Sequence, residues 1–297
     1  MPSVSSSPSQ SWQRIQAQYW ERPCSLGIAT AAFYLGAAAY AAATILFFLD
    51  LARREGSTTA AASAPVALGI GAVLHAAHVV SASLFSRICP VESLHFSLSL
   101  SALILAGMYL ILRTRFRLQA VGAVVAPLAL TFLIGAQFVG AEQSSITGVS
   151  RLLLILHITA NLAGVGFFML AGAAGAFYLV QERSLKEKRP TWLTAKLPPL
   201  DALDRTEHRL LLTGFPLLTL GVVTGGFFAS RLGPAGGAEL LRATLGYATW
   251  ILLALVLVMR AAAGWRGRRS AYGTLAGVLC VTTVILLYVI KSTGASG

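Results

Sequence analysis

Residues 152–180 read LLLILHITANLAGVGFFMLAGAAGAFYLV and contain no charged side chain. An uncharged run of this length is typical of a transmembrane helix, which needs about 20 apolar residues to cross the hydrocarbon core. Seven further apolar runs occur along the chain, separated by short clusters of charge. The sequence therefore predicts eight membrane spans, near residues 24–49, 60–86, 92–112, 118–140, 152–180, 210–230, 240–259 and 270–290.

The composition agrees with a membrane protein. Of 297 residues, 56% are hydrophobic and only 11% are charged, whereas soluble proteins carry about 25% charged residues. The apolar runs are continuous and do not alternate with polar residues, which favours helices over the strands of a barrel. We expect an all-α, polytopic helix bundle that forms a single transmembrane domain over residues 23–297, preceded by a flexible outer-side tail at 1–22.

The positions of lysine and arginine predict how this bundle is oriented. Sixteen of the 23 basic residues fall into one set of loops, at 53–54, 113–117, 183–209 and 260–269. Positive charge collects on the cytoplasmic side of membrane proteins. We therefore expect an integral protein of the cell inner (plasma) membrane with both termini on the non-cytoplasmic side. The net charge of +12 is attributed to topology and anionic lipid, so no nucleic-acid partner is expected.

The longest loop on the predicted cytoplasmic side covers residues 181–209. Asp201, Asp204 and Glu207 follow one another at intervals of three, which predicts a short amphipathic helix on the membrane surface before the sixth span. His208 is expected to be solvated there. Apart from these loop residues, the predicted spans contain no aspartate or glutamate near the middle of the membrane.

Four histidines are the candidate site residues: His75, His78, His95 and His157. All four are predicted to lie in the outer half of the membrane, where an ionisable side chain is costly and often functional. At 1.5 Å per residue, His78 and His157 lie roughly 10 Å and 8 Å below the outer surface on different helices. Neutral imidazoles that face each other across a bundle can ligate haem iron or a metal. Alternatively, each imidazole hydrogen-bonds a nearby hydroxyl or carbonyl group.

Other chemistry is poorly represented. The sequence contains no HExxH or CxxCH motif, no glycine-rich phosphate loop and no nucleophile–base pair, so no catalytic residue and no metal site are assigned. We expect a protein that handles a ligand rather than an enzyme. Cys24 and Cys89 fall near predicted outer helix ends, and both a disulfide and two free thiols are compatible with that placement.

Glycines are concentrated in the fifth and sixth spans. They are Gly164, Gly166, Gly172 and Gly175 in the fifth span and Gly214, Gly221, Gly225 and Gly226 in the sixth. Small residues allow membrane helices to approach closely. The sequence therefore predicts that each of these two spans packs tightly against a neighbour.

Three longer motifs resemble one known family. They are LLILHITANLAGVGFFMLAGAAGAFYLVQERSLK (153–186), LPPLDALDRTEHRLLLTGFPLLTLGVVTGGFFA (197–229) and the weaker CPVESLHFSLS (89–99), followed by GWRGRRSA (264–271) before the last span. Their order is similar to that in the cytochrome c assembly family, which contains CcsA-type and HemX-type membrane proteins. The resemblance implies haem handling at the outer membrane face during cytochrome c biogenesis. It also implies that His157 is an outer-side haem ligand and that either His75 or His78 is the histidine of the second span. His95 is the weaker candidate, from its placement near the outer end of the third span alone.

The chain departs from the family pattern at three places. The family's outer haem loop is rich in tryptophan, whereas the corresponding stretch here is RLGPAGGAELLR. Val258 stands where the family has a histidine, and the chain ends KSTGASG without the final histidine. The departures leave three hypotheses open. The first is a haem-handling or haem-delivery accessory. The second is a HemX-like regulator or scaffold without haem, which contacts assembly subunits or a cytoplasmic haem-biosynthesis partner through 181–209. The third is a small-solute transporter.

Overall fold

The computed structural model describes residues 23–52, 58–86, 94–116, 119–137, 151–188, 194–229 and 237–294. The predicted tail at 1–22 and the side chains of Cys24 and Cys89 lie outside the described part. All eight long elements in the described ranges are α-helices, which confirms the predicted fold class. They are α2 (Pro23–Ala52), α3 (Thr58–Ser86), α4 (Leu94–Phe116), α5 (Gly122–Gln137), α6 (Arg151–Lys186), α7 (Leu200–Ala229), α8 (Gly237–Ala263) and α9 (Arg268–Gly294), with short 3₁₀ helices η1 (Gln119–Val121) and η2 (Thr194–Lys196).

Among the described residues, seven of these helices are long and apolar enough to cross a membrane. The exception is α5, whose 16 residues extend about 24 Å, less than the roughly 30 Å of hydrocarbon. Large apolar side chains also cover the outside of the bundle, including Leu84 and Ile111, each 72% exposed. A surface rich in large apolar side chains is typical of contact with lipid, and together with the seven spanning helices it identifies an integral membrane protein.

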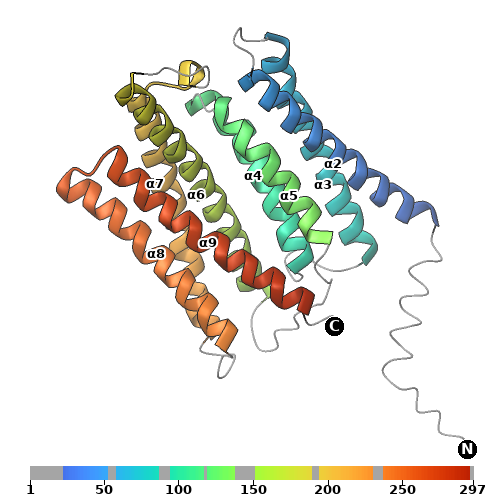
Figure 1. Cartoon of the computed structure of the whole chain (residues 1–297). Helices are drawn as coiled ribbons and strands as arrows, with labels where there is room; N and C mark the ends of the chain where they lie inside the picture. The colour runs from blue at the N-terminus through green and yellow to red at the C-terminus, as the bar shows by residue number, and fades with distance from the viewer. Residues whose placement is uncertain are drawn as a thin grey trace, which may run out of the picture.

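The helices form three groups (Figure 1). Helices α2 and α3 pair at one side, α4 and α5 lie in the middle, and α6 to α9 form the other side. Helix α2 begins and α9 ends at the lower end of the bundle in this view. The opposite end, where α6 and α8 finish and α7 and α9 begin, is called the basic end below because Arg183, Lys186, Arg260, Arg266 and Arg268 belong to it.

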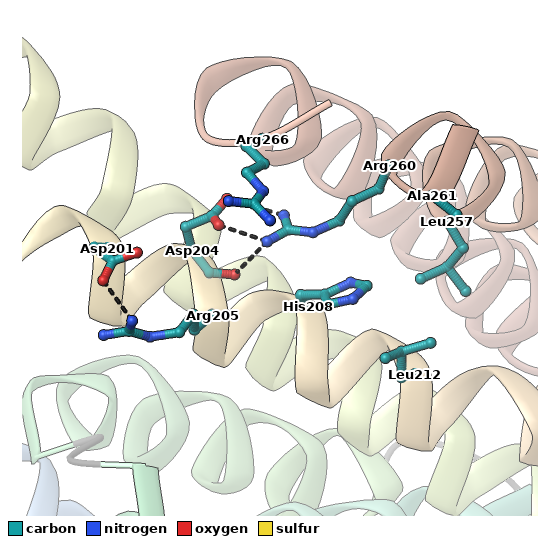
Figure 2. A pocket seen from close by; sticks show the side chains of 9 residues that line it. All are labelled: Asp201, Asp204, Arg205, His208, Leu212, Leu257, Arg260, Ala261 and Arg266. Carbon is teal, nitrogen blue, oxygen red and sulfur yellow. Dashed lines mark hydrogen bonds and ion pairs between the residues drawn. The ribbon is translucent and has the colours of Figure 1, made fainter. Parts of the chain in front are cut away.

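The predicted surface helix at 201–209 is wrong. These residues form the first turns of α7, which runs without a break from Leu200 to Ala229. The side chains of Asp204 and Glu207 point into the bundle and are buried, Glu207 completely; Asp204 faces Arg260 of α8 (Figure 2). Helices α8 and α9 supply partners for both carboxylates, which makes burial tolerable, although Oε2 of Glu207 has no hydrogen-bond partner among the described residues. His208 is half-buried rather than solvated.

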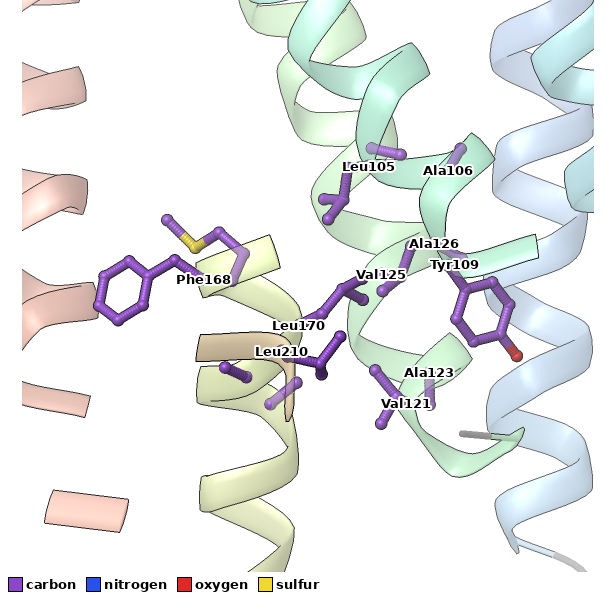
Figure 3. Close-up of a cluster of buried hydrophobic side chains, with 14 of the residues drawn as sticks. Leu105, Ala106, Tyr109, Val121, Ala123, Val125, Ala126, Phe168, Leu170 and Leu210 are labelled. Atoms are coloured by element: carbon purple, nitrogen blue, oxygen red, sulfur yellow. The ribbon is translucent and has the colours of Figure 1, made fainter. Parts of the chain in front are cut away.

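Helices α4, α5, α6 and α7 meet in a core of aliphatic side chains (Figure 3). Leu105, Val125, Leu170 and Leu210 come from these four helices in turn, and each is at most 2% exposed. Burying such side chains stabilises the protein by about 1.5–3 kcal/mol each relative to water. In lipid that term is smaller, so close packing has to hold the helices together.

The glycines of α6 and α7 provide that close packing, as predicted. A Cβ atom added at Gly164 would lie 2.7 Å from Cγ of Leu218, and one added at Gly214 would lie 2.7 Å from Cβ of Phe167. Neither position therefore has room for a side chain. The result is a tight α6–α7 pair, on which the geometry of His157 depends.

Candidate functional site

His75 is fully buried between three helices. Its Nε2 atom lies 2.7 Å from the hydroxyl of Ser99 on α4, and its Nδ1 atom lies 3.3 Å from the hydroxyl of Tyr40 on α2. A neutral imidazole has one donor nitrogen and one acceptor nitrogen, and here both have partners. His75 thus links α3 to α2 and α4, as expected of a structural histidine.

His78 lies one turn further along α3 and is bound differently. Its Nδ1 atom lies 2.9 Å from the carbonyl oxygen of Ala29 on α2. A carbonyl only accepts, so in the neutral ring Nδ1 carries the proton and Nε2 carries the lone pair. Within the described part of the chain, Nε2 is buried and has no hydrogen-bond partner. Histidines that ligate metals commonly have this arrangement, with the other ring nitrogen donating to a carbonyl.

The ring of His157 on α6 is held by α7. Its Nδ1 atom lies 2.8 Å from the hydroxyl of Thr224, and that hydroxyl lies 2.7 Å from the carbonyl oxygen of Leu220. The threonine proton is directed to the carbonyl, so the hydroxyl accepts from Nδ1–H of His157. The acceptor nitrogen Nε2 is 3.3 Å from the amide of Asn161, which also donates to the His157 carbonyl oxygen at 3.0 Å.

Two glycines of α7 make room for this arrangement. A Cβ atom at Gly225 would lie 3.1 Å from Cε1 of His157, and a Cβ atom at Gly221 would overlap the side-chain amide of Asn161. The small-residue face that the sequence assigned to helix packing therefore also positions a candidate ligand. This second role could not be predicted from the sequence, because the sequence does not show which side of α6 faces α7.

His95 is fixed against a different helix. Its Nδ1 atom lies 2.7 Å from the carbonyl oxygen of Ala136 on α5, and its ring packs edge-on against Phe96 with centroids 5.2 Å apart. The four candidate histidines thus contact different helices: His75 and His78 contact α2, His95 contacts α5 and His157 contacts α7. His75 and His78 have ring centroids 6.5 Å apart on α3, whereas His157 belongs to the α6–α7 pair, with α4 and α5 between the two groups (Figure 1).

No group of three or more histidine, cysteine, aspartate or glutamate residues that could hold a metal ion occurs within the described ranges. The histidines therefore do not form a compact multi-ligand metal centre there. One or two imidazoles are enough for an iron porphyrin, whose other four ligands belong to the macrocycle.

A second polar cluster lies at the basic end and was not foreseen. Arg260 of α8 donates to the Asp204 carboxylate at 2.9 Å and 2.5 Å, and the two side chains are only 8% and 9% exposed. The same carboxylate accepts the backbone N–H of Gly267 at 2.7 Å. Glu207 accepts from the hydroxyls of Thr274 at 2.6 Å and Ser270 at 3.1 Å.

This cluster explains why two of the sequence motifs occur together. Asp204 ends the LPPLDALD stretch, and Gly267 belongs to GWRGRRSA. Gly267 has a φ of +62°, a conformation that favours glycine, and the ring of Tyr178 packs where a side chain would lie. The two motifs are therefore the two sides of one contact between α7 and the α8–α9 turn.

Comparison with known proteins gives consistent results. The family model described as "Cytochrome C assembly protein" matches residues 91–295. The chain is 28% identical to Protein HemX of Brevibacillus brevis over 193 residues, which are 63% of this chain and 68% of that protein. It is 24% identical to the cytochrome c biogenesis protein CcsA of Guillardia theta over 215 residues. That alignment covers 65% of this chain and 70% of the relative.

A further relative matches over a shorter length. CcsA of a Synechococcus species is 34% identical over 101 residues, so this chain spans 29% of that protein. No solved structure matches the chain. The family match includes His95 and His157, whereas His75 and His78 precede it.

Proposed function

The chain belongs to the cytochrome c assembly protein family, and on that premise we propose that it handles haem at the outer face of the inner membrane as an accessory of cytochrome c biogenesis. The proposed orientation places the basic end in the cytoplasm and the histidines in the outer half of the membrane. Its proposed partners are the lipid bilayer and other cytochrome c assembly subunits.

The observation that carries the proposal is the buried Nε2 atom of His78, which has no hydrogen-bond partner among the described residues. A buried polar nitrogen without a partner is unfavourable, and an iron atom is a suitable partner for an imidazole lone pair. The Nδ1–H contact to Ala29 fixes the ring and its tautomer. The donor chemistry of His78 would therefore suit haem iron, and it favours His78 over His75, whose two ring nitrogens are both engaged.

His157 is the proposed second ligand; because α4 and α5 lie between it and His78 (Figure 1), ligation of one iron by both imidazoles requires these helices to move apart. Thr224 holds its Nδ1–H and so directs the lone pair to Nε2, where the weak contact from Asn161 can be given up. Bound haem would supply an iron centre that two imidazoles can coordinate. The residues of this chain would bind and orient the group, and the surrounding apolar helices would exclude water from it.

Absorption spectroscopy of the protein purified in mild detergent from haem-replete cells tests the proposal. We expect a Soret band, and sharp α and β bands after reduction, that are lost in His78→Ala and His157→Ala. The matched variant His95→Ala should keep these bands. A flat spectrum in folded wild type, even after haem is added, would exclude the haem-ligand role.

A second candidate function is a HemX-like regulator or scaffold that binds no haem. It is favoured by the outer stretch SRLGPAGGAEL (230–240), which lacks the tryptophans of the family's haem loop, and by the similarity to HemX. The partner would be contacted by the exposed end of α6, where Arg183 and Lys186 are 81% and 60% exposed.

The two candidates differ in which residues matter. For a regulator, Arg183→Glu with Lys186→Glu would abolish the effect of the chain on cellular haem, and His78→Ala with His157→Ala would leave that effect intact. For a haem-handling protein, the reverse result is expected.

A further inference from the structure

A pocket of about 500 Å³ lies at the basic end of the bundle, between the start of α7 and the end of α8 (Figure 2). None of the four candidate histidines lines it, and it does not depend on the proposed haem site. Its charged part includes Arg205, Arg260 and Arg266, and its apolar part includes Leu212 and Leu257.

The charged side chains that line this pocket do not balance. Its two acids are already engaged, because Asp204 pairs with Arg260 and Asp201 pairs with Arg205 at 2.6 Å. Arg266 remains, and within the described residues its guanidinium makes no hydrogen bond or ion pair. The pocket therefore carries one positive charge in excess, on an arginine that is exposed to its opening.

The backbone holds Arg266 in place. It precedes Gly267, whose N–H is bound by Asp204 and where an added Cβ would overlap the side chain of Tyr178. The turn between α8 and α9 is thereby tied to α7, and Arg266 extends from this fixed turn over the pocket (Figure 2). A cation on a fixed turn loses less conformational freedom when it binds an anion than one on a loose loop.

His208 supplies a second group without a partner. It lines the pocket, and its Nδ1 atom is buried and has no hydrogen-bond partner in the described part of the chain. A neutral or protonated imidazole can donate from this nitrogen. An oxyanion between Arg266 and His208 would therefore satisfy a cation and a buried nitrogen together.

The remaining lining is apolar. Leu212 and Leu257 lie on one side of the pocket, away from Arg266 (Figure 2). The pocket also lies at the helix ends, where the headgroups of a bilayer are found. The arginines suit the charged group of a ligand, and the two leucines suit an apolar group next to that charge.

We propose that this pocket binds a phosphate group, supplied by the headgroup of an anionic phospholipid or by a soluble phosphate. Arginine forks match the several oxygens of a phosphate, and Arg266 is the residue that provides the charge. Asp204 already occupies the carboxylate-binding edge of Arg260, so the incoming anion binds beside that ion pair and does not replace it.

Native mass spectrometry of the full chain in a neutral detergent tests the proposal. Wild type, Arg266→Gln and the control Arg269→Gln would be titrated with phosphatidylglycerol and, separately, with inorganic phosphate. Arg269 is exposed on α9, does not line the pocket, and loses the same charge. Both changed residues are exposed, so folding should be preserved; thermal unfolding checks this.

We expect Arg266→Gln to weaken binding by about tenfold or more, the equivalent of one charge-assisted hydrogen bond, and Arg269→Gln to leave it unchanged. Binding of phosphatidylglycerol alone would identify a lipid site, and binding of inorganic phosphate as well would identify a site for the phosphate itself. Equal losses in the two variants, or no binding of either probe, would overturn the proposal.

Discussion

Asp204 and Arg260 form a buried ion pair that joins the first turns of α7 to the last turns of α8. Both charges are removed from water, and each is stabilised mainly by the other. The Asp204 carboxylate also accepts the N–H of Gly267. This one side chain of α7 therefore contacts both α8 and the turn between α8 and α9.

Removing one member of this pair should be strongly destabilising. Arg260→Met leaves the Asp204 carboxylate buried without its main partner, which costs about 3–5 kcal/mol of unfolding free energy. The double variant Asp204→Leu with Arg260→Met should recover much of that loss. Denaturant unfolding in mixed micelles measures both. Breaking the exposed Asp201–Arg205 pair with Asp201→Asn is the control and should cost under about 1 kcal/mol.

The α8–α9 turn offers a matched pair of glycines. Gly264 and Gly267 have φ values of +64° and +62°, so alanine at either position should cost about 1–2 kcal/mol of backbone strain. Gly267 also packs on Tyr178, whereas no atom lies within 4 Å of a Cβ at Gly264. Gly267→Ala should therefore lower the melting temperature more than Gly264→Ala. Equal shifts would contradict the proposed packing role of Tyr178.

His75 and His78 should respond in opposite ways to the same substitution. His75→Ala leaves the hydroxyls of Ser99 and Tyr40 without their buried partner, so we expect a loss of about 1–3 kcal/mol in stability while bound haem is retained. His78→Ala should abolish haem binding with a smaller loss of stability. Melting curves and absorption spectra of both variants decide the matter. Haem loss in His75→Ala alone would reverse the assignment.

Thr224 should act on haem only through His157. Thr224→Val keeps the shape of the side chain but removes the oxygen that accepts from Nδ1–H. We expect haem affinity to fall about 10–100-fold, as for other residues that orient a ligating histidine. Thr224→Ser keeps the oxygen and should keep the affinity. Haem titration followed at the Soret band provides the comparison, and equal affinities for the valine and serine variants would rule out the positioning role.

The fold was predictable because membrane spans are a local property of the sequence. Uncharged runs such as 152–180 are long enough to specify a helix without any knowledge of their neighbours. The packing of α6 on α7 was predictable for a similar reason, since the glycines at 164 and 214 mark surfaces that can approach closely.

The polar sites were less predictable because their partners are distant in sequence. His75 and His78 look alike in the sequence, and only Ser99 and the Ala29 carbonyl distinguish them, 24 and 49 residues away. The acids of 201–209 have the spacing of a surface helix. Their burial depends on Arg260, Ser270 and Thr274, which a local pattern does not reveal.

The same separation affects how the protein is made. Asp204 is synthesised 56 residues before Arg260, and Glu207 is synthesised 67 residues before Thr274. At about 5–20 residues per second, Asp204 waits about 3–11 s for its partner. The start of α7 can take its final place only after α8 and α9 have emerged from the ribosome. A nascent chain that stops before α8 would therefore leave both carboxylates without the partners that they have in the folded protein.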